Sequence, residues 1–555
     1  MRIQLLLFTL LLFTATMLPQ DRSQARSMVI TRYGIAATSH VQASQAGAQV
    51  LAQGGSAADA AIAANAVLGV TEPMMNGIGG DLFVLYWDAK SRKLYGLNAS
   101  GWAPKGLTRQ HVLAKDATRM PESGIDSVTV PGAVDGWSKL HQRFGKLPWK
   151  DLFRSAIFYA RDGYPVPELI HGYWEGSREN LLHDPESRRV YLPGGKAPAV
   201  GEIFRNPDLA QSLDLISNQG SSAFYRGAIG DSILKTSQEL GGTMSAADLS
   251  EFSSEWVDPI FTTYRDWTVY ELPPNGQGMA ALEMLNIMET FPAASDGPLN
   301  ANELHTRIEA MKLAYADLER YNADPRFAKV PVKGLLSKEY AQQRAKLIDS
   351  EKANCQVAAG TPPASETTYL SVVDRDGNIA SLIQSNYDEF GSGITVRGRG
   401  FVLQDRGALF SLDPASPNVL APRKRPFHTI IPAFMQRGDV HIGFGIMGGA
   451  NQPLAHAQFV SNVVDYGMDI QQALETARFT VSPQRGCHIL IESRVKPDVL
   501  KQLSGKGHEL EIRGDFSSRM GRGQAVLHDS KTAVNYGASD PRADGSAEPE
   551  APPIK

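Results

Sequence analysis

The most informative part of this chain of 555 residues is an abrupt change of character near residue 366. Residues 350–365 (SEKANCQVAAGTPPAS) are polar, include prolines and show no apolar periodicity, so they predict an exposed loop. Residues 369–383 (YLSVVDRDGNIASLI) instead predict two β-strands joined by a turn at 374–378, because apolar and β-branched residues flank an Asp-Gly-Asn sequence. The fold must therefore place a strand pair directly behind a loop.

Helix and strand signals also alternate in the first hundred residues. Residues 43–68 are rich in alanine and predict helix, with Ser56 as an N-cap and Asp59 favoured by the dipole of the first turn. A glycine-rich turn follows at 76–81 (NGIGGD), and the apolar run at 82–87 predicts a buried strand. The chain therefore mixes helices with strands.

Composition excludes several classes of protein. The formal net charge is −4, from 55 basic and 59 acidic residues, and this leaves no basic footprint for nucleic-acid binding. Two cysteines, Cys355 and Cys487, exclude a disulfide scaffold and a cysteine-rich zinc site, but one bridge between them stays open. The 12 histidines lack metal-site spacing, and no glycine motif for phosphate or dinucleotide binding is present. We therefore expect neither a metal nor a cofactor.

The first 27 residues predict an export signal. A short positive start precedes an almost uncharged apolar run at residues 3–18, and residues 20–27 are abruptly polar. The run has 16 residues, fewer than the roughly 20 that span a bilayer, so a cleaved signal peptide is favoured over an anchor. We therefore expect a periplasmic or extracellular protein without stable membrane insertion. If Met28 is the true start, the protein would instead be cytoplasmic.

Thr367 is the candidate centre of the chemistry, in the segment ETTYLSVVD at 366–374. Taken alone, a threonine here is an ordinary β-branched strand residue. Other features accompany it: Ser385 in IQSNYDEFGSGI, RKRP at 423–426, GIMGG at 445–449 and YGASDPR at 536–542.

Together these features resemble the γ-glutamyltransferase family of N-terminal-nucleophile (Ntn) hydrolases, whose members include γ-glutamyltranspeptidases and glutathione hydrolases. The resemblance covers most of residues 29–545. Its further motifs are GGSAADAAIAANAVLGVTEP at 54–73, GIGGD at 77–81, VPGAVDGW at 130–137 and PPNGQG at 273–278.

The resemblance implies an α+β fold, a four-layer αββα sandwich. It also implies a proenzyme that cuts itself into two chains, which stay associated as a heterodimer. After a signal peptide at 1–27, the large chain would then be residues 28–366 and the small chain residues 367–555.

The implied chemistry suits the residue types. A threonine hydroxyl is a weak nucleophile and needs a base. A cut between Glu366 and Thr367 gives Thr367 a free α-amine with an unperturbed pKa of about 8, so nucleophile and base lie on one residue. In the uncut chain, the hydroxyl of Thr367 would attack the carbonyl of Glu366, and water would hydrolyse the resulting ester.

The resemblance also assigns roles to other residues. Gly448 and Gly449 would donate backbone N–H groups to the oxyanion, and the hydroxyl of Ser385 would hydrogen-bond the nucleophile. Thr368 would support the new terminus. Substrate contacts are expected from Asn386, Tyr387, Arg406, His428 and Thr429.

The sequence departs from the family where the substrate's α-amino acid group would bind. Ser100 stands in place of an arginine, Leu409 in place of an acid, and His428-Thr429 in place of a serine pair. An ammonium group facing Leu409 would lose its ionic partner, at a cost of several kcal/mol if it is desolvated. Arg406, which the family pattern lacks, would instead favour a carboxylate.

Three interpretations of function therefore stay open. The first is hydrolysis or transfer of the acyl group of γ-glutamyl compounds such as glutathione, in which Asp405 could take the amine. The second is hydrolysis of a small acidic amide without an α-amine, oxamate-like or glutaryl. The third is an exported, unprocessed relative without activity. Small-molecule amides or peptides are the expected partners.

Overall fold

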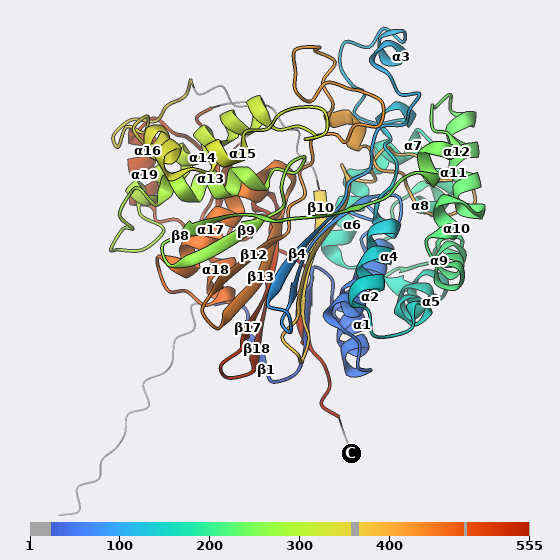
Figure 1. The fold of residues 1–555 in the computed structure, drawn as a ribbon, viewed down its shortest axis with the longest axis horizontal. Coiled ribbons are helices and arrows are strands. Elements are labelled where there is room, and N and C mark those ends of the chain that lie inside the picture. The colour runs from blue at the N-terminus through green and yellow to red at the C-terminus, as the bar shows by residue number, and fades with distance from the viewer. Residues whose placement is uncertain (1–23, 357–365, 482–485, 554–555) are drawn as a thin grey trace, which may run out of the picture.

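The computed structural model describes residues 24–356, 366–481 and 486–553. Residues 1–23 of the predicted signal peptide and residues 357–365 of the predicted loop lie outside this range. Figure 1 shows two β-sheets packed face to face between two layers of helices. This arrangement confirms the predicted four-layer αββα sandwich.

The first sheet has seven antiparallel strands. Their order is β19 (Ser546–Pro549), β2 (Ile35–Thr38), β10 (Glu366–Val373), β11 (Ile379–Tyr387), β3 (Asp81–Asp88), β4 (Lys93–Ala99) and β7 (Glu255–Val257). The predicted strand pair is confirmed as β10 and β11, and it lies in the middle of this sheet between strands from the first hundred residues.

The second sheet also has seven antiparallel strands. Their order is β1 (Val29–Thr31), β18 (Val534–Ser539), β17 (Arg522–Asp529), β13 (Val440–Met447), β12 (Ala433–Arg437), β9 (Trp267–Glu271) and β8 (Ile260–Tyr264). Both sheets therefore combine strands from before and after residue 366.

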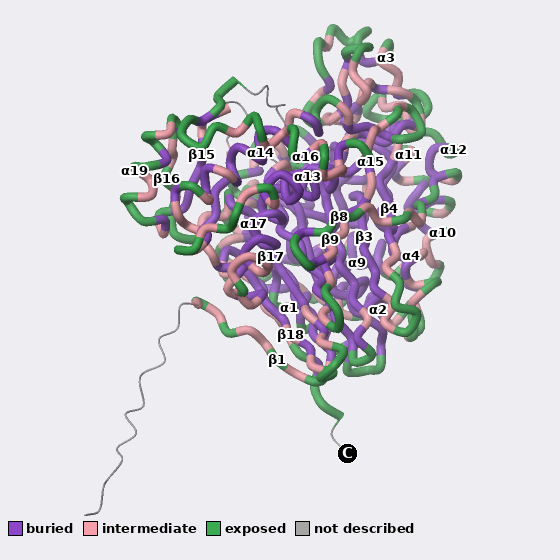
Figure 2. Tube along the Cα trace, turned by 60° about the vertical axis from the view of Figure 1, so that its left-hand side comes forward, coloured by how far each residue is buried: buried purple, intermediate pink, exposed green. Residues whose placement is uncertain are grey.

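Successive side chains of a strand point to opposite faces of its sheet, so one strand contacts both the facing sheet and a helix layer. In β3, Phe83 and Leu85 point into the space between the sheets, whereas Leu82 and Val84 point toward the helices. Both faces of the strand are apolar because both are covered, as the continuous apolar run at 82–87 predicts. Figure 2 shows the result, a buried centre of strands inside a partly exposed shell.

Helices cover the outer face of each sheet (Figure 1). Those on the first sheet are α1 (Val41–Ala52), α2 (Ala57–Thr71) and α4 (Ala133–Phe144), and those on the second are α13 (Gly278–Met288), α17 (Gln452–Val464) and α18 (Ile470–Glu475), with α14 (Ala301–Tyr321) behind α13. The predicted N-cap is confirmed, because the hydroxyl of Ser56 accepts from the backbone N–H of Asp59 at 3.1 Å and opens α2.

Smaller elements complete the chain. The other helices are α3 (Arg109–Leu113), α5 (Arg154–Asp162), α6 (Glu168–Gly176), α7 (Arg178–Leu182), α8 (Pro185–Tyr191), α9 (Pro207–Gln219), α10 (Ser222–Tyr225), α11 (Ala228–Glu239), α12 (Ala246–Ser250), α15 (Val332–Leu335), α16 (Lys338–Ala345) and α19 (Pro497–Gly505). The other strands are β5 (Tyr164–Pro165), β6 (Ile203–Phe204), β14 (Phe479–Val481), β15 (His488–Glu492) and β16 (Glu509–Arg513).

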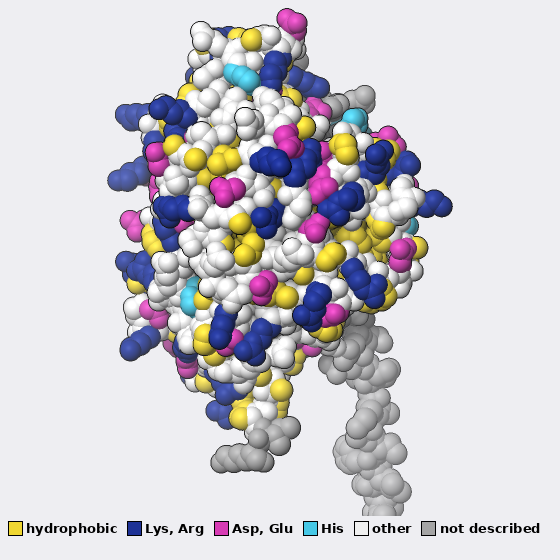
Figure 3. Space-filling view, turned by 90° about the vertical axis from the view of Figure 1, so that its right-hand side faces the viewer, with side chains coloured by type: hydrophobic (Ala, Val, Ile, Leu, Met, Phe, Trp, Pro, Cys, Tyr) yellow, Lys and Arg dark blue, Asp and Glu magenta, His cyan; other side chains and the backbone are white. Residues whose placement is uncertain are grey.

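Three observations bear on questions that the sequence raised. Cys355 and Cys487 form a disulfide. Within the described ranges, no helix combines the length and apolar character needed to cross a membrane. On the face shown in Figure 3, lysine and arginine side chains are interspersed with acidic ones and form no continuous basic stripe.

The contact between the sheets predicts a stability effect at Gly445. A Cβ atom at this position of β13 would lie 2.4–2.8 Å from three ring atoms of Tyr369 on β10. We expect Gly445→Ala to lower the free energy of unfolding by about 1–3 kcal/mol, because the ring has to move within a packed core. Urea unfolding measures the change. In the control Gly505→Ala, where a Cβ meets nothing within 4 Å, stability should change by less than about 0.5 kcal/mol. Equal effects of the two substitutions would contradict this account.

Candidate active site

The side chain of Thr367 lies between the two sheets, at the start of β10. Alternate side chains of β10 point toward β13. The hydroxyl of Ser371 donates to the carbonyl oxygen of Gly443 at 3.0 Å, and the ring of Tyr369 lies against Gly445. Thr367 continues this row and is fully buried. Because Thr367 precedes Tyr369 by two residues in this row, it lies level with the C-terminal end of β13.

A β-bulge lies opposite Thr367. The pairing register of β10 and β11 shifts between Glu366 and Thr368, so two residues of β11, Ser385 and Asn386, oppose the single residue Thr367. Bulges redirect side chains and are frequent next to active sites. Here the hydroxyl of Thr367 donates to the hydroxyl oxygen of Ser385 at 3.3 Å. The predicted nucleophile and its predicted hydroxyl partner therefore meet.

Arg406 lies directly behind Ser385. Its Nη2 donates to the hydroxyl of Ser385 at 2.8 Å, and its Nη1 donates to the hydroxyl of Thr429 at 2.7 Å. The guanidinium also lies 4.5 Å from the centre of the Tyr387 ring. Burial lowers the pKa of Arg406 to about 10, so this fully buried side chain keeps its charge at neutral pH. Thr367 is thus two hydrogen bonds from a permanent positive charge.

Tyr387 has an unusual backbone conformation. Its φ is +86°, in a region where a bulky side chain is uncommon. Its backbone N–H donates to the hydroxyl of Ser385 at 2.8 Å. Strained backbone of this kind persists where the surroundings fix it, and it is often found at functional sites.

His428 is bonded within the protein. The backbone N–H of Ile430 donates to its Nδ1 at 3.4 Å, which places the proton of the neutral ring on Nε2, and Nε2 donates to Asp81 at 3.0 Å. Burial, together with the charges of Arg406 and Arg425, holds the pKa of His428 well below 6.5. Both ring nitrogens therefore have partners, and the expected contact of His428 with substrate stays a prediction.

Asp81 is a buried acid that the sequence analysis did not single out. Its other oxygen accepts from the backbone N–H groups of Gly101 at 3.0 Å and Gly132 at 3.2 Å, and from the side chain of Gln404 at 2.8 Å. Burial raises the pKa of Asp81 to about 7, against the opposing effect of Arg406. The aspartate ends the GIGGD motif, so this motif connects to the site through His428.

Thr368 points to the opposite side, toward α2. Its hydroxyl donates to the carboxylate of Glu72 at 2.6 Å and accepts from the side chain of Asn76 at 3.1 Å. Burial raises the pKa of Glu72, and the nearby Arg522 charge and two hydroxyl donors oppose that effect. This network fixes the start of β10, and the support that Thr368 is expected to give a new terminus stays a prediction. Glu72 and Asn76 lie in quoted motifs, but no local signal assigned them.

Gly448 and Gly449 form the turn between β13 and α17. Their φ values are +131° and +58°, which favour glycine, and a Cβ on Gly448 would lie 3.2 Å from the Cα of Gly521. The turn leads into the N-terminus of α17, where the helix dipole favours negative charge. The side chain of Gln277 donates to the carbonyl oxygens of Gly449 at 2.8 Å and Thr429 at 2.5 Å. Gln277, from the PPNGQG motif, thus links the Gly448-Gly449 turn to Thr429, which accepts a hydrogen bond from Arg406.

Several buried polar atoms around Thr367 have no hydrogen-bond partner among the described residues. These are Oδ1 of Asn386, the hydroxyl of Tyr387, Oδ2 of Asp405, Nε of Arg406 and both amide atoms of Asn451. Native proteins leave few such atoms, and groups of them indicate bound water or ligand. Asn451, which the sequence analysis missed, lies two residues after Gly449.

A pocket of about 720 Å³ is lined by Leu409 and Tyr315, whereas Thr367, Ser385 and Arg406 are not among its lining residues. Leu409 in its wall ends the 3₁₀ helix Arg406–Leu409, and Tyr315 in another wall donates its hydroxyl to the carbonyl oxygen of Ala450. Its wall is thus connected to Arg406 along the chain and to the residue after Gly449 through a hydrogen bond. Much of its remaining lining is apolar: Leu113, Met120, Leu318, Phe410, Leu412 and Phe427. Such a volume suits a drug-sized group.

The family model described as Gamma-glutamyltranspeptidase matches residues 43–550. This chain belongs to the γ-glutamyltranspeptidase family. The glutathione hydrolase-like YwrD proenzyme of Bacillus subtilis (strain 168) is 38% identical over 513 residues, 92% of this chain and 97% of the relative. The oxamate amidohydrolase proenzyme of Klebsiella pneumoniae is 33% identical, over 93% of this chain and 98% of the relative. The crystal structure of cephalosporin acylase from Bacillus halodurans has a TM-score of 0.89 at 40% identity, covering 96% of this chain and 99% of that chain.

These likenesses confirm the predicted family, its Ntn-hydrolase fold and its class of enzyme, an amidohydrolase. The names of the three relatives point to three different substrates. The family alone therefore does not fix the acyl group that this enzyme accepts.

One group of described side chains away from Thr367 has the composition of a metal site. Ligand atoms of His305, Glu309 and His508 lie within 4.8 Å of one another. Nζ of Lys312, however, lies 2.7 Å from the carboxylate of Glu309, and the two histidine rings share a hydrogen bond of 2.8 Å. The ammonium group would compete with a cation for Glu309, so this group fits a metal poorly.

The buried state of His428 predicts the pH dependence of catalysis. Because its pKa lies well below 6.5, His428 is neutral between pH 6.5 and 8 and cannot produce an acidic limb in that range. A terminal amine on Thr367 has an unperturbed pKa of about 8, which the Arg406 charge lowers. Since the base must be unprotonated, kcat/KM should rise with pH through that lowered pKa, and His428→Gln should keep this rise. Loss of the limb in His428→Gln with unchanged KM would make the histidine the base.

Proposed function

We propose that this protein is a self-processing amidohydrolase for a small amide whose acyl group carries a carboxylate and lacks an α-amine. The observation that supports it most is the chain from Thr367 through Ser385 to the buried guanidinium of Arg406. A fixed cation beside the nucleophile favours an anionic acyl group, and a guanidinium matches a carboxylate in geometry.

Maturation would begin with a cut between Glu366 and Thr367. The hydroxyl of Thr367 attacks the carbonyl carbon of Glu366, the amide becomes an ester, and water hydrolyses it to a carboxylate, a free hydroxyl and the α-amine. The products are a large chain of residues 28–366 and a small chain of residues 367–555, which stay together. Two of the relatives named above are called proenzymes, which supports this step.

Export is part of the same proposal. The apolar run at residues 3–18 has the length of a signal peptide, and the Cys355–Cys487 disulfide suits an oxidising compartment. The large chain would then begin near Met28, after removal of the signal.

Catalysis would repeat the chemistry of the cut. The α-amine of Thr367 takes the proton of its hydroxyl, which attacks the substrate carbonyl. Backbone N–H groups of Gly448 and Gly449 stabilise the oxyanion, and such donors are each worth about 3–4 kcal/mol. The protonated α-amine then returns its proton to the nitrogen of the leaving amine, the amine departs, and water hydrolyses the acyl ester.

Where the acyl group would bind, the protein offers hydrogen-bond donors. At position 409, where the family has an acid for the α-amine, this chain offers no ionic partner. Nε of Arg406 and the hydroxyl of Tyr387 lack partners among the described residues and can donate to a carboxylate. Leu409 is apolar, and the hydroxyl of buried Ser100 accepts from Asn275 at 3.0 Å. Burial raises the pKa of Asp405 well above its usual range, so its unpartnered oxygen also suits a donor to a carboxylate.

A γ-glutamyl compound such as glutathione is the second candidate. Asp405 is the observation that favours it, because a bound ammonium group would stabilise the ionised acid and pair with its Oδ2. The first candidate therefore needs a protonated Asp405, and the second needs an ionised one.

Self-processing predicts two chains in the purified protein. Terminal sequencing of the small chain should begin at Thr367, and that of the large chain near Met28. Thr367→Ala should stay one inactive chain, whereas the control Ser371→Ala, whose hydroxyl donates to Gly443, should still be cut. A small chain that begins elsewhere would overturn the mechanism.

Acyl selectivity is tested with matched glutaryl and γ-glutamyl anilides. An α-amine beside Leu409 and Arg406 meets desolvation and like-charge repulsion, each worth about 1–3 kcal/mol, so glutaryl should be preferred roughly ten- to hundredfold per effect in kcat/KM. Arg406→Ala should erase the preference, and the control Arg406→Lys should keep part of it.

The opposite outcome identifies the second candidate. A γ-glutamyl preference of about tenfold or more, lost in Asp405→Asn, would show that Asp405 pairs with the amine and that the enzyme is a glutathione-type hydrolase.

A further inference from the structure

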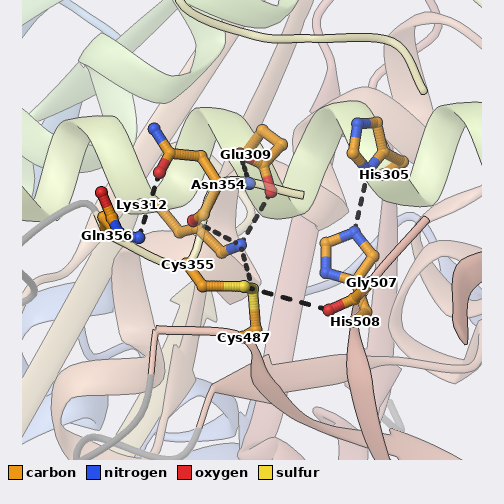
Figure 4. The surroundings of a disulfide bond; sticks show 9 residues. All are labelled: His305, Glu309, Lys312, Asn354, Cys355, Gln356, Cys487, Gly507 and His508. Atoms are coloured by element: carbon orange, nitrogen blue, oxygen red, sulfur yellow. Dashed lines mark hydrogen bonds and ion pairs between the residues drawn. A yellow bond between two sulfur atoms is a disulfide. The ribbon is translucent and has the colours of Figure 1, made fainter. Parts of the chain in front are cut away.

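The disulfide between Cys355 and Cys487 bridges the two sides of the proposed cut (Figure 4). Cys355 precedes Glu366, and Cys487 follows Thr367. We propose that in the mature enzyme this disulfide is an interchain bond that joins the large chain to the small chain. The inference rests on the proposed function, because the cut between Glu366 and Thr367 creates the two chains.

The disulfide lies within an extended contact between the two prospective chains. Figure 4 shows side chains of α14 facing the disulfide. Nζ of Lys312 lies 3.5 Å from Sγ of Cys487, and Nδ1 of His305 lies 2.8 Å from Nε2 of His508. In each of these pairs the first residue precedes the cut and the second follows it. The bond is therefore set in packed structure.

Neighbouring backbone holds the Cys355 end in place. The N–H of Asn354 donates to the carboxylate of Glu309 at 3.2 Å, and the N–H of Ala353 donates to the carbonyl oxygen of Lys506 at 2.7 Å. A Cβ atom on Gly486 would lie 2.7 Å from the carbonyl oxygen of Cys355, so only glycine allows this close approach. The segment of the large chain around Cys355 is thus held against the small chain near Cys487.

The folded enzyme does not depend on this bond to keep its chains together. In the first sheet, β10 and β11 of the small chain lie between β2 and β3 of the large chain. The chains cannot separate unless this sheet is broken. The bond therefore acts mainly on the unfolded state, which is one covalent molecule with the disulfide and two free chains without it.

The two covalent steps are chemically independent. Disulfide formation removes two electrons and two protons from the thiols and passes them to a thiol–disulfide oxidoreductase of an oxidising compartment. The cut is a hydrolysis and moves no electrons between reactants. In the proenzyme the bond closes a loop across 132 residues, and the cut opens that loop and converts the bond into an interchain link.

Denaturing gels of alkylated protein test the link. The wild-type enzyme should run as one species without reductant and as two with dithiothreitol. Cys355→Ser and Cys487→Ser should give two chains in both lanes, and uncut Thr367→Ala one chain in both. Two wild-type chains without reductant would overturn the link alone. One wild-type chain after reduction would overturn the proposed cut, and the link with it.

Urea unfolding at two protein concentrations tests the consequence. The wild-type midpoint should stay the same over a hundredfold dilution, because unfolding releases no second molecule. In cut Cys355→Ser, whose exposed residue makes it the milder variant, the midpoint should fall on dilution. Uncut Thr367→Ala should stay independent of concentration even when reduced. A wild-type midpoint that falls on dilution as much as that of Cys355→Ser would overturn the inference.

Discussion

The hydrogen bond from Thr367 to Ser385 connects the strand pairing of this enzyme to its proposed chemistry. It forms because β11 bulges opposite Thr367, and the bulge is held in turn by the backbone N–H of Tyr387 on the same Ser385 hydroxyl. Moving either strand by one residue would turn Thr367 away from the space between the sheets. The packing of Tyr369 against Gly445 opposes that shift, so the core of the sandwich also sets the position of the proposed nucleophile.

Charge is the second constraint on the site. Arg406 is fully buried, and two of the acids that act on it, Asp81 and Asp405, are buried as well. A guanidinium with a pKa near 10 keeps its charge, whereas burial raises the pKa of both Asp81 and Asp405. A cation surrounded by acids of raised pKa is a site that gains from a bound anion. In our proposal, this electrostatic balance favours an anionic acyl group over a zwitterionic one.

Local patterns in the sequence predicted part of this arrangement. The strand pair behind Thr367 and the cap at Ser56 follow from residues close together in the chain, whereas the role of Thr367 came from a resemblance spread over residues 29–545. Asp81 and His428 are 347 residues apart, and Gln277 lies 172 residues from Gly449, so their pairing follows only from the fold. The pairing of Cys355 with Cys487 is of the same kind. Asn451 had no signal beyond its place after the glycine turn, and its importance appears only because both amide atoms lack partners among the described residues.

The central claim is that the hydroxyl of Thr367 carries the acyl group during turnover. Acid-quenched reaction of the enzyme with a glutaryl anilide, followed by mass spectrometry of the small chain, tests it most directly. The account predicts a gain of one glutaryl group that maps to the peptide beginning at Thr367 and disappears as the anilide is exhausted. An adduct on any other residue, or product release in a burst with no adduct on the small chain, would contradict it.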